Sequence, residues 1–326
     1  MVDTYKCIDI NECRETPSVC SQICENTQGN YSCKCVEGFE KSSIDKKLCK
    51  MIGPKIEANL LFTNNYYLRN ISLLNNNYNL IKDGFKSARG LAYNYNGSII
   101  YLIDGLSGIL YKLKLNNSNN IALENVEILI NDLNGDERGI AFDWINSKLY
   151  YLNANKLTVC DENGNFRSTL LNESILQEAT GLVLDPRLGY LFLTDWKYPS
   201  FIGRLDLDGK NFKKIINDEI SQPIGITIDI FAQRIWWTDT HLKRIEFSNY
   251  NGRNRNIVIE SAQTAYPFAL AYFDGNIYWT DRANHSIFAA DALIGGNMTI
   301  LKQGTIHSVF ALTVYHYSLQ PSGLYF

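Results

Sequence analysis

The tetrapeptide Tyr278-Trp279-Thr280-Asp281 ends a short apolar segment, and variants of it recur along the chain. These variants are Leu61-Phe62-Thr63-Asn64, Tyr101-Leu102-Ile103-Asp104, Tyr150-Tyr151-Leu152-Asn153, Phe192-Leu193-Thr194-Asp195 and Trp236-Trp237-Thr238-Asp239. Their last residues, through Asp281, are separated by 40, 49, 42, 44 and 42 positions. A second signal precedes most of them: Gly90-Leu91-Ala92, Gly139-Ile140-Ala141, Gly181-Leu182-Val183, Gly225-Ile226-Thr227 and Phe268-Ala269-Leu270-Ala271. Self-similarity at such a period indicates a repeat architecture.

Each repeat is predicted to form four short strands. In the repeat that contains Trp237, they cover residues 224–229, 234–239, 243–248 and 255–260. Asn251-Gly252 is a turn signal between the third and fourth of these strands. The first two are almost wholly apolar, as strands buried on both faces are. A period of about 40–45 residues with four strands is typical of a β-propeller blade.

Six tetrapeptides predict an all-β fold with six blades. Residues 58–83 supply three strands without a first strand, whereas residues 309–314 form a first strand with nothing after it. We therefore expect the ring to close by pairing residues 58–83 with 309–318, which also hides the edge strands. The propeller is predicted to span residues 51–326.

The cysteines predict a separate module before the propeller. Seven of the eight lie between Cys7 and Cys49, and Cys160 stands alone. Such crowding is typical of a small secreted domain stabilised by disulfides, because about forty residues bury too little core to fold alone. The six from Cys13 onward allow 15 connectivities, so their pairing stays open. Zinc is the rival interpretation, but no His and no paired C-x-x-C is nearby. We expect Cys160 to be a buried filler in a strand.

Oxygen-bearing residues surround two of these cysteines. Asp9 and Glu12 precede Cys13, while Asn26 follows Cys24, with Gly29 in the next turn. Calcium takes six to eight oxygen ligands from carboxylates, amides and backbone carbonyls at about 2.3–2.6 Å. The module is therefore predicted to bind Ca²⁺.

The stretches Asp9–Cys13 and Cys24–Cys33 resemble the calcium-binding EGF-like module. The repeats after them resemble the class B, or YWTD, repeats of the low-density lipoprotein receptor family, as do residues 194–199 and the ending Gln320-Pro321-x-Gly323. The resemblance implies an EGF-like module at 9–50 and a truncated preceding module at 1–8, to which Cys7 belongs.

The resemblance also assigns roles to individual residues. It implies the disulfides Cys13–Cys24, Cys20–Cys33 and Cys35–Cys49. It implies that Ca²⁺ is bound by the side chains of Asp9, Glu12 and Asn26 and by the carbonyls of Ile10, Thr27 and Asn30. It implies that the motif aspartates tie neighbouring blades together and are structural: Asp104, Asp195, Asp239 and Asp281. Asn64 and Asn153 keep an acceptor oxygen at the same position.

Loops after the second strands and before the first strands share one propeller face, which is the expected ligand-binding face. Its candidate residues are Trp196, Lys197, Tyr198, Gln222, His241, Lys243, Tyr266, Arg282 and Asn284. In family members that release ligand in acid, histidines on this face become charged. Here Lys243 and Tyr266 stand at the matching positions, Gln222 replaces a second family Trp, and Trp196 is retained. The resemblance implies that the propeller supports ligand release or receptor recycling, but these residues leave open whether acid triggers the release. His241 is close by and is the candidate substitute.

Composition narrows the function. The formal charge of −3 gives no reason to expect nucleic acid, and no run of 18 apolar residues or N-terminal signal core is present. The four histidines form no H-E-x-x-H, and G-x-S-x-G and phosphate loops are absent, so catalysis such as that of a propeller hydrolase is disfavoured. The resemblance implies the extracellular part of a plasma-membrane and endosomal receptor. Its anchor would lie outside this sequence, and its ligands would be lipoprotein, yolk-type or signalling proteins. A nidogen-like matrix module is the alternative.

Seven N-x-[S/T] sequons occur, at Asn30, Asn70, Asn96, Asn116, Asn172, Asn284 and Asn297. Asparagine is abundant here, so several arise by chance. We expect some to be glycosylated if the chain enters the secretory route.

Overall fold

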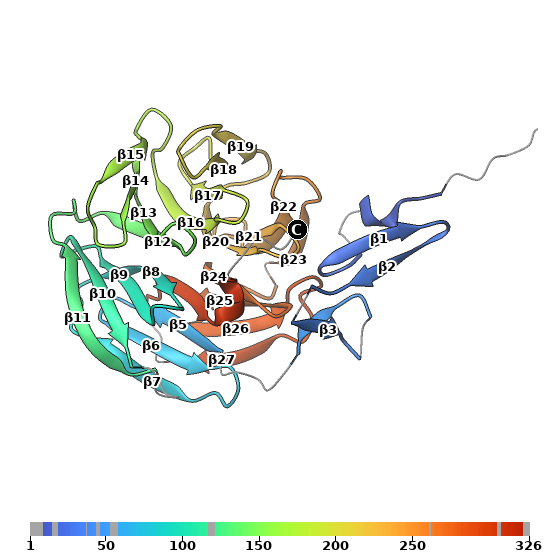
Figure 1. The fold of residues 1–326 in the computed structure, drawn as a ribbon, viewed down its shortest axis with the longest axis horizontal. Helices are drawn as coiled ribbons and strands as arrows, with labels where there is room; N and C mark the ends of the chain where they lie inside the picture. The colour runs from blue at the N-terminus through green and yellow to red at the C-terminus, as the bar shows by residue number, and fades with distance from the viewer. Residues whose placement is uncertain are drawn as a thin grey trace, which may run out of the picture.

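The computed structural model describes residues 9–14, 19–36, 38–43, 46–52, 58–116, 121–260, 262–304 and 308–321. The truncated module predicted at residues 1–8, with Cys7, lies outside the described residues. Figure 1 shows a ring of sheets with a smaller strand-rich module at its side. Among the described residues, the only helices are the short 3₁₀ turns η1 (Glu12–Arg14) and η2 (Tyr317–Leu319), and none is long and apolar enough to cross a membrane.

The small module consists of two hairpins. β1 (Ile23–Thr27) pairs antiparallel with β2 (Asn30–Lys34), and β3 (Phe39–Lys41) pairs with β4 (Cys49–Met51). Three disulfides fasten it: Cys13–Cys24, Cys20–Cys33 and Cys35–Cys49. This is the pairing that the resemblance implies, and it replaces the hydrophobic core that so short a chain lacks.

Six four-stranded antiparallel sheets form the ring, which confirms the all-β, six-bladed prediction. Blade 1 is β8 (Ala88–Asn94), β9 (Ile99–Asp104), β10 (Ile109–Leu115) and β11 (Leu123–Ile130). Blade 2 is β12 (Glu137–Asp143), β13 (Lys148–Asn153), β14 (Lys156–Asp161) and β15 (Ser168–Leu171). Blade 3 is β16 (Ala179–Asp185), β17 (Tyr190–Asp195), β18 (Phe201–Asp206) and β19 (Lys213–Ile216).

Blade 4 is β20 (Pro223–Asp229), β21 (Arg234–Asp239), β22 (Arg244–Asn249) and β23 (Asn256–Ile259), within one or two residues of the predicted strands. Blade 5 is β24 (Pro267–Phe273), β25 (Asn276–Asp281), β26 (Ser286–Asp291) and β27 (Thr299–Gln303). Blade 6 joins both ends of the ring: β28 (Ala311–Tyr315) pairs with β5 (Asn59–Thr63), followed by β6 (Tyr67–Ser72) and β7 (Tyr78–Asp83).

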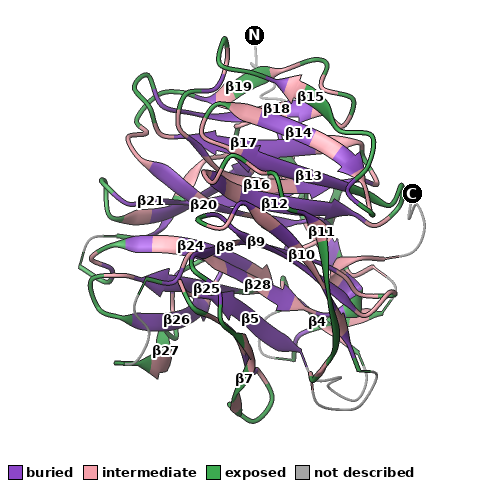
Figure 2. Ribbon diagram, turned by 90° about the vertical axis from the view of Figure 1, so that its left-hand side faces the viewer, coloured by how far each residue is buried: buried purple, intermediate pink, exposed green. Residues whose placement is uncertain are grey.

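The hydrophobic core lies mainly between neighbouring blades. Figure 2 shows the inner strands buried, whereas exposed residues gather on turns and outer strands. Trp236 and Trp279, both 0% exposed, belong to one cluster that spans blades 4 and 5. The Trp236 ring stacks on Tyr272 of the next blade, with 4.8 Å between ring centroids. Cys160 is a free, buried thiol in β14 and packs in the cluster between blades 1 and 2, as a filler does.

Candidate calcium site and ligand-binding face

The hairpin β1–β2 brings the predicted calcium residues toward the N-terminal segment. The Asp9 carboxylate accepts hydrogen bonds from Asn26 Nδ2 at 2.8 Å and from the Gly29 amide at 2.5 Å. The bond from the Gly29 amide, followed by that from Asn26, lowers the pKa of Asp9. Asp9 is therefore held as a carboxylate beside the hairpin.

Glu12 gives the second indication of a cation site. Its Oε2 atom is buried and has no hydrogen-bond partner among the described residues. An unpartnered buried carboxylate oxygen is costly unless a cation or donor meets it. The described residues contain no group of three or more His, Cys, Asp and Glu that could hold a metal. The donor set here is instead two carboxylates, one amide and backbone carbonyls, which is chemistry that suits calcium.

The EGF-like module docks against blades 4 and 5. Arg234 of β21 donates from Nη2 to the carbonyl of Cys20 at 2.8 Å. Phe39 meets Phe231 edge-on, with 5.2 Å between centroids, and the Met51 amide donates to Asp274 Oδ1 at 3.2 Å. Because Cys20 is bonded to Cys33 of β2, this docking holds the hairpin that carries Asn26.

The motif aspartates fasten the segments that connect one blade to the next. Asp239, which is 0% exposed, accepts from the amides of Ser221 (2.7 Å) and Gln222, just before β20, and from His241 and Leu242 in its own turn. Asp104, Asp195 and Asp281 hold the corresponding amides in their blades. Within the described part of the chain, the side-chain oxygens of Asn64 and Asn153 accept hydrogen bonds from amides of their own turns.

Two motif threonines form direct hydrogen bonds between blades, a role that the sequence interpretation missed. Thr194 Oγ1 donates to the carbonyl of Ile224 at 2.9 Å, and Thr238 Oγ1 donates to that of Phe268 at 2.7 Å. The recurring glycine lies opposite: a Cβ at Gly225 would overlap the Phe268 carbonyl oxygen. Repeated Thr and Gly therefore let adjacent inner strands approach closely.

In blade 2, Asn153 stands in place of the motif aspartate, and a different carboxylate holds the connecting segment. Asn153 of β13 faces Glu137 of β12. The Glu137 carboxylate, in a residue only 2% exposed, accepts from the amides of Asn134 at 3.1 Å and Gly135 at 3.0 Å. In blade 2 the carboxylate therefore lies on β12 instead of β13, but it still holds the segment that connects blade 1 to blade 2.

The upper face, which carries the turns Trp196–Ser200 and Thr240–Lys243, contains a hollow of about 390 Å³. This upper hollow is lined by Arg89, Asp136, Arg138, Thr180, Trp196, Gln222, Ile224, Tyr266, Phe268 and Phe310. Three predicted ligand-face residues, Trp196, Gln222 and Tyr266, therefore come together. Arg138 pairs with Glu178 at 2.7 Å and with Asp136 at 3.1 Å, and Arg89 also faces Asp136.

The other predicted ligand-face residues do not line the upper hollow. Tyr198 is 91% exposed, and His241 and Lys243 are exposed on the turn after β21. Arg282 stacks on Phe268, 3.2 Å from the ring centroid, and over Phe310. Burial lowers the pKa of Arg282 to about 10. Arg282 is half-buried, and because its guanidinium covers two aromatic rings that line the upper hollow, it supports the floor of the face.

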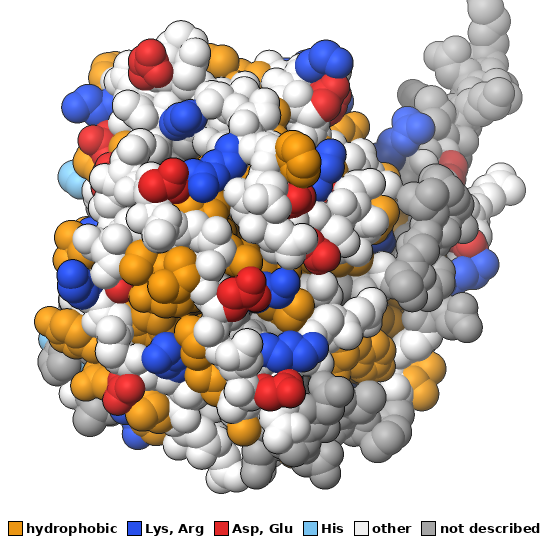
Figure 3. All heavy atoms as spheres, turned by 60° about the vertical axis from the view of Figure 1, so that its left-hand side comes forward, with side chains coloured by type: hydrophobic (Ala, Val, Ile, Leu, Met, Phe, Trp, Pro, Cys, Tyr) orange, Lys and Arg blue, Asp and Glu red, His pale blue; other side chains and the backbone are white. Residues whose placement is uncertain are grey.

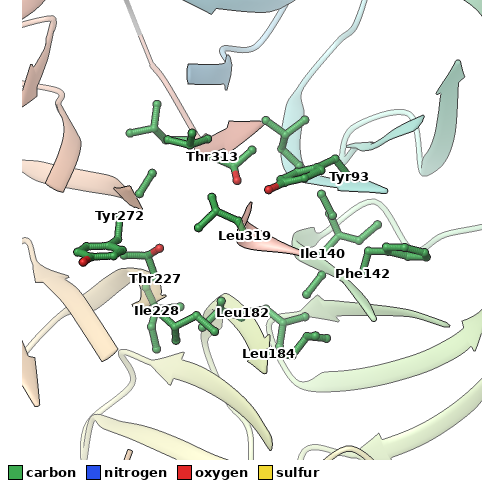
Figure 4. Close-up of a pocket in the computed structure, with 18 of the residues that line it drawn as sticks. Tyr93, Ile140, Phe142, Leu182, Leu184, Thr227, Ile228, Tyr272, Thr313 and Leu319 are labelled. Carbon is green, nitrogen blue, oxygen red and sulfur yellow. The ribbon is translucent and has the colours of Figure 1, made fainter. Parts of the chain in front are cut away.

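A narrower cavity of about 160 Å³ runs through the centre of the ring, between inner strands. Figure 4 shows Leu319 of η2 pointing into it, among Tyr93, Ile140 and Thr227. Gln320 holds this end segment in place by donating to the Tyr93 carbonyl at 2.6 Å and accepting from the Tyr95 amide at 2.8 Å. His316, just before η2, is 1% exposed, and burial lowers its pKa to about 4.

Comparisons with known proteins agree with this geometry. Residues 9–49 match the family model described as a calcium-binding EGF domain. The chain is 29% identical over 97% of its length to the vitellogenin receptor Yl of Drosophila melanogaster. It is 32% identical over 98% of its length to low-density lipoprotein receptor-related protein 5 of Mus musculus.

Over its EGF-like module and its propeller, the chain is therefore similar to members of the low-density lipoprotein receptor family. It spans 16% and 19% of the length of these two relatives. The propeller fold also resembles a chain in a crystal structure of a nidogen/laminin complex, with a TM-score of 0.73, 24% identity, and coverage of 79% of this chain and 98% of that one.

The surface of the chain carries both signs of charge. In Figure 3, basic and acidic side chains are interspersed with apolar ones over the face in view. This pattern agrees with the formal charge of −3. The visible face has no extended patch of a single charge sign that would attract a highly charged polymer.

The sequons of the chain differ in accessibility. Asn30, Asn96, Asn172, Asn284 and Asn297 are exposed, and so is Asn116, although the rest of its sequon lies outside the described residues. Asn70 is 3% exposed and donates from Nδ2 to Asn59 Oδ1 at 2.7 Å. Of the candidate glycosylation sites, Asn70 is thus the one whose side chain β6 turns into the sheet.

Proposed function

We propose that this chain is the extracellular part of a non-enzymatic endocytic receptor that binds a protein ligand in the upper hollow. The hollow itself carries the proposal, because Trp196 and Tyr266 stand at its wall beside partly exposed arginines. Aromatic and arginine side chains dominate the binding energy of protein interfaces. A yolk-type protein is the first ligand class to test, since two of the matched relatives are named vitellogenin receptors.

Calcium is the proposed cofactor of the EGF-like module. The side chains of Asp9, Glu12 and Asn26 would hold the ion together with the carbonyls of Ile10, Thr27 and Asn30. Bound calcium would supply positive charge for Glu12 Oε2, which is buried without a hydrogen-bond partner. It would also fasten the N-terminal segment to β1 and β2.

Calcium binding is tested by titration calorimetry on the whole chain. Glu12→Gln should weaken calcium binding by tenfold or more, since tenfold is about 1.4 kcal/mol and hydrogen bonds or ligands from charged groups contribute about 1.5–3 kcal/mol. Glu25→Gln is the matched control, because Glu25 lies in β1 but pairs with Lys34 on the surface. Equal affinities for both variants would reject the ligand set.

Ligand binding is tested by surface plasmon resonance with purified vitellogenin over the immobilised chain. Trp196→Ala and Tyr266→Ala should each raise Kd by about tenfold, the usual effect of truncating an interface anchor worth more than 1 kcal/mol. Phe166→Ala is the control, because Phe166 is 89% exposed on the turn between β14 and β15, at the opposite end of the blades. An unchanged Kd for Trp196→Ala and Tyr266→Ala would reject the hollow as the site.

Acid-triggered release is tested separately, by repeating the measurement at endosomal pH. His241 is exposed but lies outside the hollow, while Tyr266 and Gln222 line it. We therefore propose that affinity changes little on acidification, and that any change is lost in His241→Gln. A large change that persists in that variant would place the acid sensor elsewhere without contradicting ligand binding.

A nidogen-like matrix function is the second candidate, favoured by the shared propeller fold. It would bind a laminin through the same face. The same immobilised chain should therefore be presented with a laminin. Binding to laminin but not to vitellogenin would favour the matrix candidate over the receptor.

A further inference from the structure

Asn172 begins the segment that connects blade 2 to blade 3. Asn172, Glu173 and Ser174 are all exposed. Directly after them, Leu176 is 0% exposed in the core between these blades, and Asp195 holds the amides of Gln177 and Glu178. The three sequon residues are therefore exposed to solvent, and the residues directly after them are fixed by packing and hydrogen bonds.

The sequon hydroxyl at this site already faces the acceptor side chain. Ser174 Oγ donates to Asn172 Oδ1 at 2.6 Å, and the Ser174 amide donates to the same oxygen at 3.1 Å. The amides of Ile175 and Leu176 donate to the Asn172 carbonyl, both at 3.0 Å. All these bonds use oxygen atoms of the exposed Asn172, so none of them occupies Nδ2, the nitrogen that takes up sugar.

Asn70 shows the opposite arrangement. It sits in the middle of β6, 3% exposed, and its Nδ2 is bonded to Asn59 Oδ1 of β5. N-linked glycans are bulky and polar and occupy surfaces. A sugar on this nitrogen would break the bond to Asn59 and force blade 6 apart, at the sheet where the ring closes.

Asn284 is intermediate. Its side chain is exposed, but the hydroxyl of Ser286 is buried and donates to the Asn284 carbonyl at 2.8 Å rather than to its side chain. At Asn172, by contrast, the sequon hydroxyl bonds the acceptor amide itself.

We propose that Asn172 is an N-glycosylation site of this protein and that Asn70, despite its sequon, is unmodified in the folded chain. In the transfer, Asn172 Nδ2 forms a bond to C1 of a lipid-linked oligosaccharide diphosphate. The bond from C1 to the diphosphate oxygen breaks, the lipid diphosphate leaves with the electron pair, and one Nδ2 proton is released. The glycan projects from the outer end of the connecting segment, whose inner end reaches Glu178, the ion-pair partner of Arg138 in the upper hollow.

The test is secretion of the whole chain from a eukaryotic host behind a heterologous signal peptide. Peptide mapping by mass spectrometry, after enzymatic deglycosylation in heavy-oxygen water, marks each occupied asparagine by its conversion to aspartate. We expect the label at Asn172 and not at Asn70. The host supplies the secretory route, so the result does not depend on the proposed receptor function.

Variants at the sequon separate modification from structure. Ser174→Ala should lose one glycan step on an electrophoretic ladder, whereas Ser174→Thr, which keeps the hydroxyl, should retain it. Asn70→Gln should lose no step, and the wild-type peptide map answers the same question if that variant is not secreted. Secreted protein with an unlabelled Asn172, or with a labelled Asn70, would overturn the proposal.

Discussion

The substitution Glu137→Ala tests whether a buried carboxylate holds the connection between blades 1 and 2. It removes the acceptor for the amides of Asn134 and Gly135, at 3.1 and 3.0 Å. Hydrogen bonds to charged groups contribute about 1.5–3 kcal/mol each, but water can reach Asn134 and Gly135, so we take about 1 kcal/mol for each. The expected loss in the free energy of unfolding is therefore about 2 kcal/mol.

This loss can be measured by calorimetry. Unfolding entropy is about 2.1 cal/mol/K per residue, so for a propeller of about 276 residues a loss of about 2 kcal/mol lowers Tm by about 3.5 °C. The decisive measurement adds Asn153→Asp, which restores a carboxylate at the motif position facing residue 137. The double variant Glu137→Ala/Asn153→Asp should regain most of the loss. Asn153→Asp alone should be neutral or destabilising, because it sets two carboxylates opposite each other. If the double variant melts no higher than Glu137→Ala, then Glu137 does not replace the motif aspartate.

Three further predictions follow from buried polar groups. Asp239→Ala should lower the free energy of unfolding by about 1–3 kcal/mol, because several backbone amides lose their hydrogen-bond acceptor. The loss should be clearly larger than that of Asn64→Ala, whose oxygen accepts from amides of its own turn. Equal melting temperatures for the two variants would contradict the role of Asp239. His316 has a pKa of about 4 in the folded chain, so the unfolded chain binds more protons below its unfolded pKa of about 6.5. Stability should therefore fall from about pH 6.5 to about pH 4, and His316→Gln should flatten that part of a Tm-against-pH curve; an unaltered curve would assign the effect to other groups. Arg234→Ala, which removes the donor to the Cys20 carbonyl, should increase proteolysis of the EGF-like module while leaving its disulfides intact; unchanged cleavage kinetics would show that the module is held by its other contacts.

Much of the fold could be predicted because its signals are local and repeated. The tetrapeptide ending at Asp281 marks the second strand of a blade, and five variants repeat it, so the six-bladed ring followed from counting. The sequence shows the recurring threonine and glycine of the motifs, but it does not show that they contact residues of the next blade. That contact joins different repeats, such as Thr238 to Phe268, and no period along one repeat reveals it.

The candidate site was predictable only in part, for a related reason. Trp196, Gln222 and Tyr266 come from different blades, and their meeting at one hollow depends on how each turn projects. Arg282 directly follows a motif aspartate, as Trp196 does, but its guanidinium packs on the neighbouring rings of Phe268 and Phe310. No sequence signal separated these two outcomes, because each is decided by residues of an adjacent blade.

The sequence by itself determined the module order, the number of blades and the calcium-type donor set around Cys13 and Cys24, since these depend on spacing and residue chemistry. Only the tertiary structure decided which polar groups are accessible. In the folded chain the Asn70 side chain is buried in the sheet, whereas Asn172 is exposed. Glu137 accepts the backbone hydrogen bonds that a motif aspartate accepts in other blades. The physical reason is that burial and hydrogen-bond partnership belong to the packed ring, in which each blade completes the environment of its neighbours.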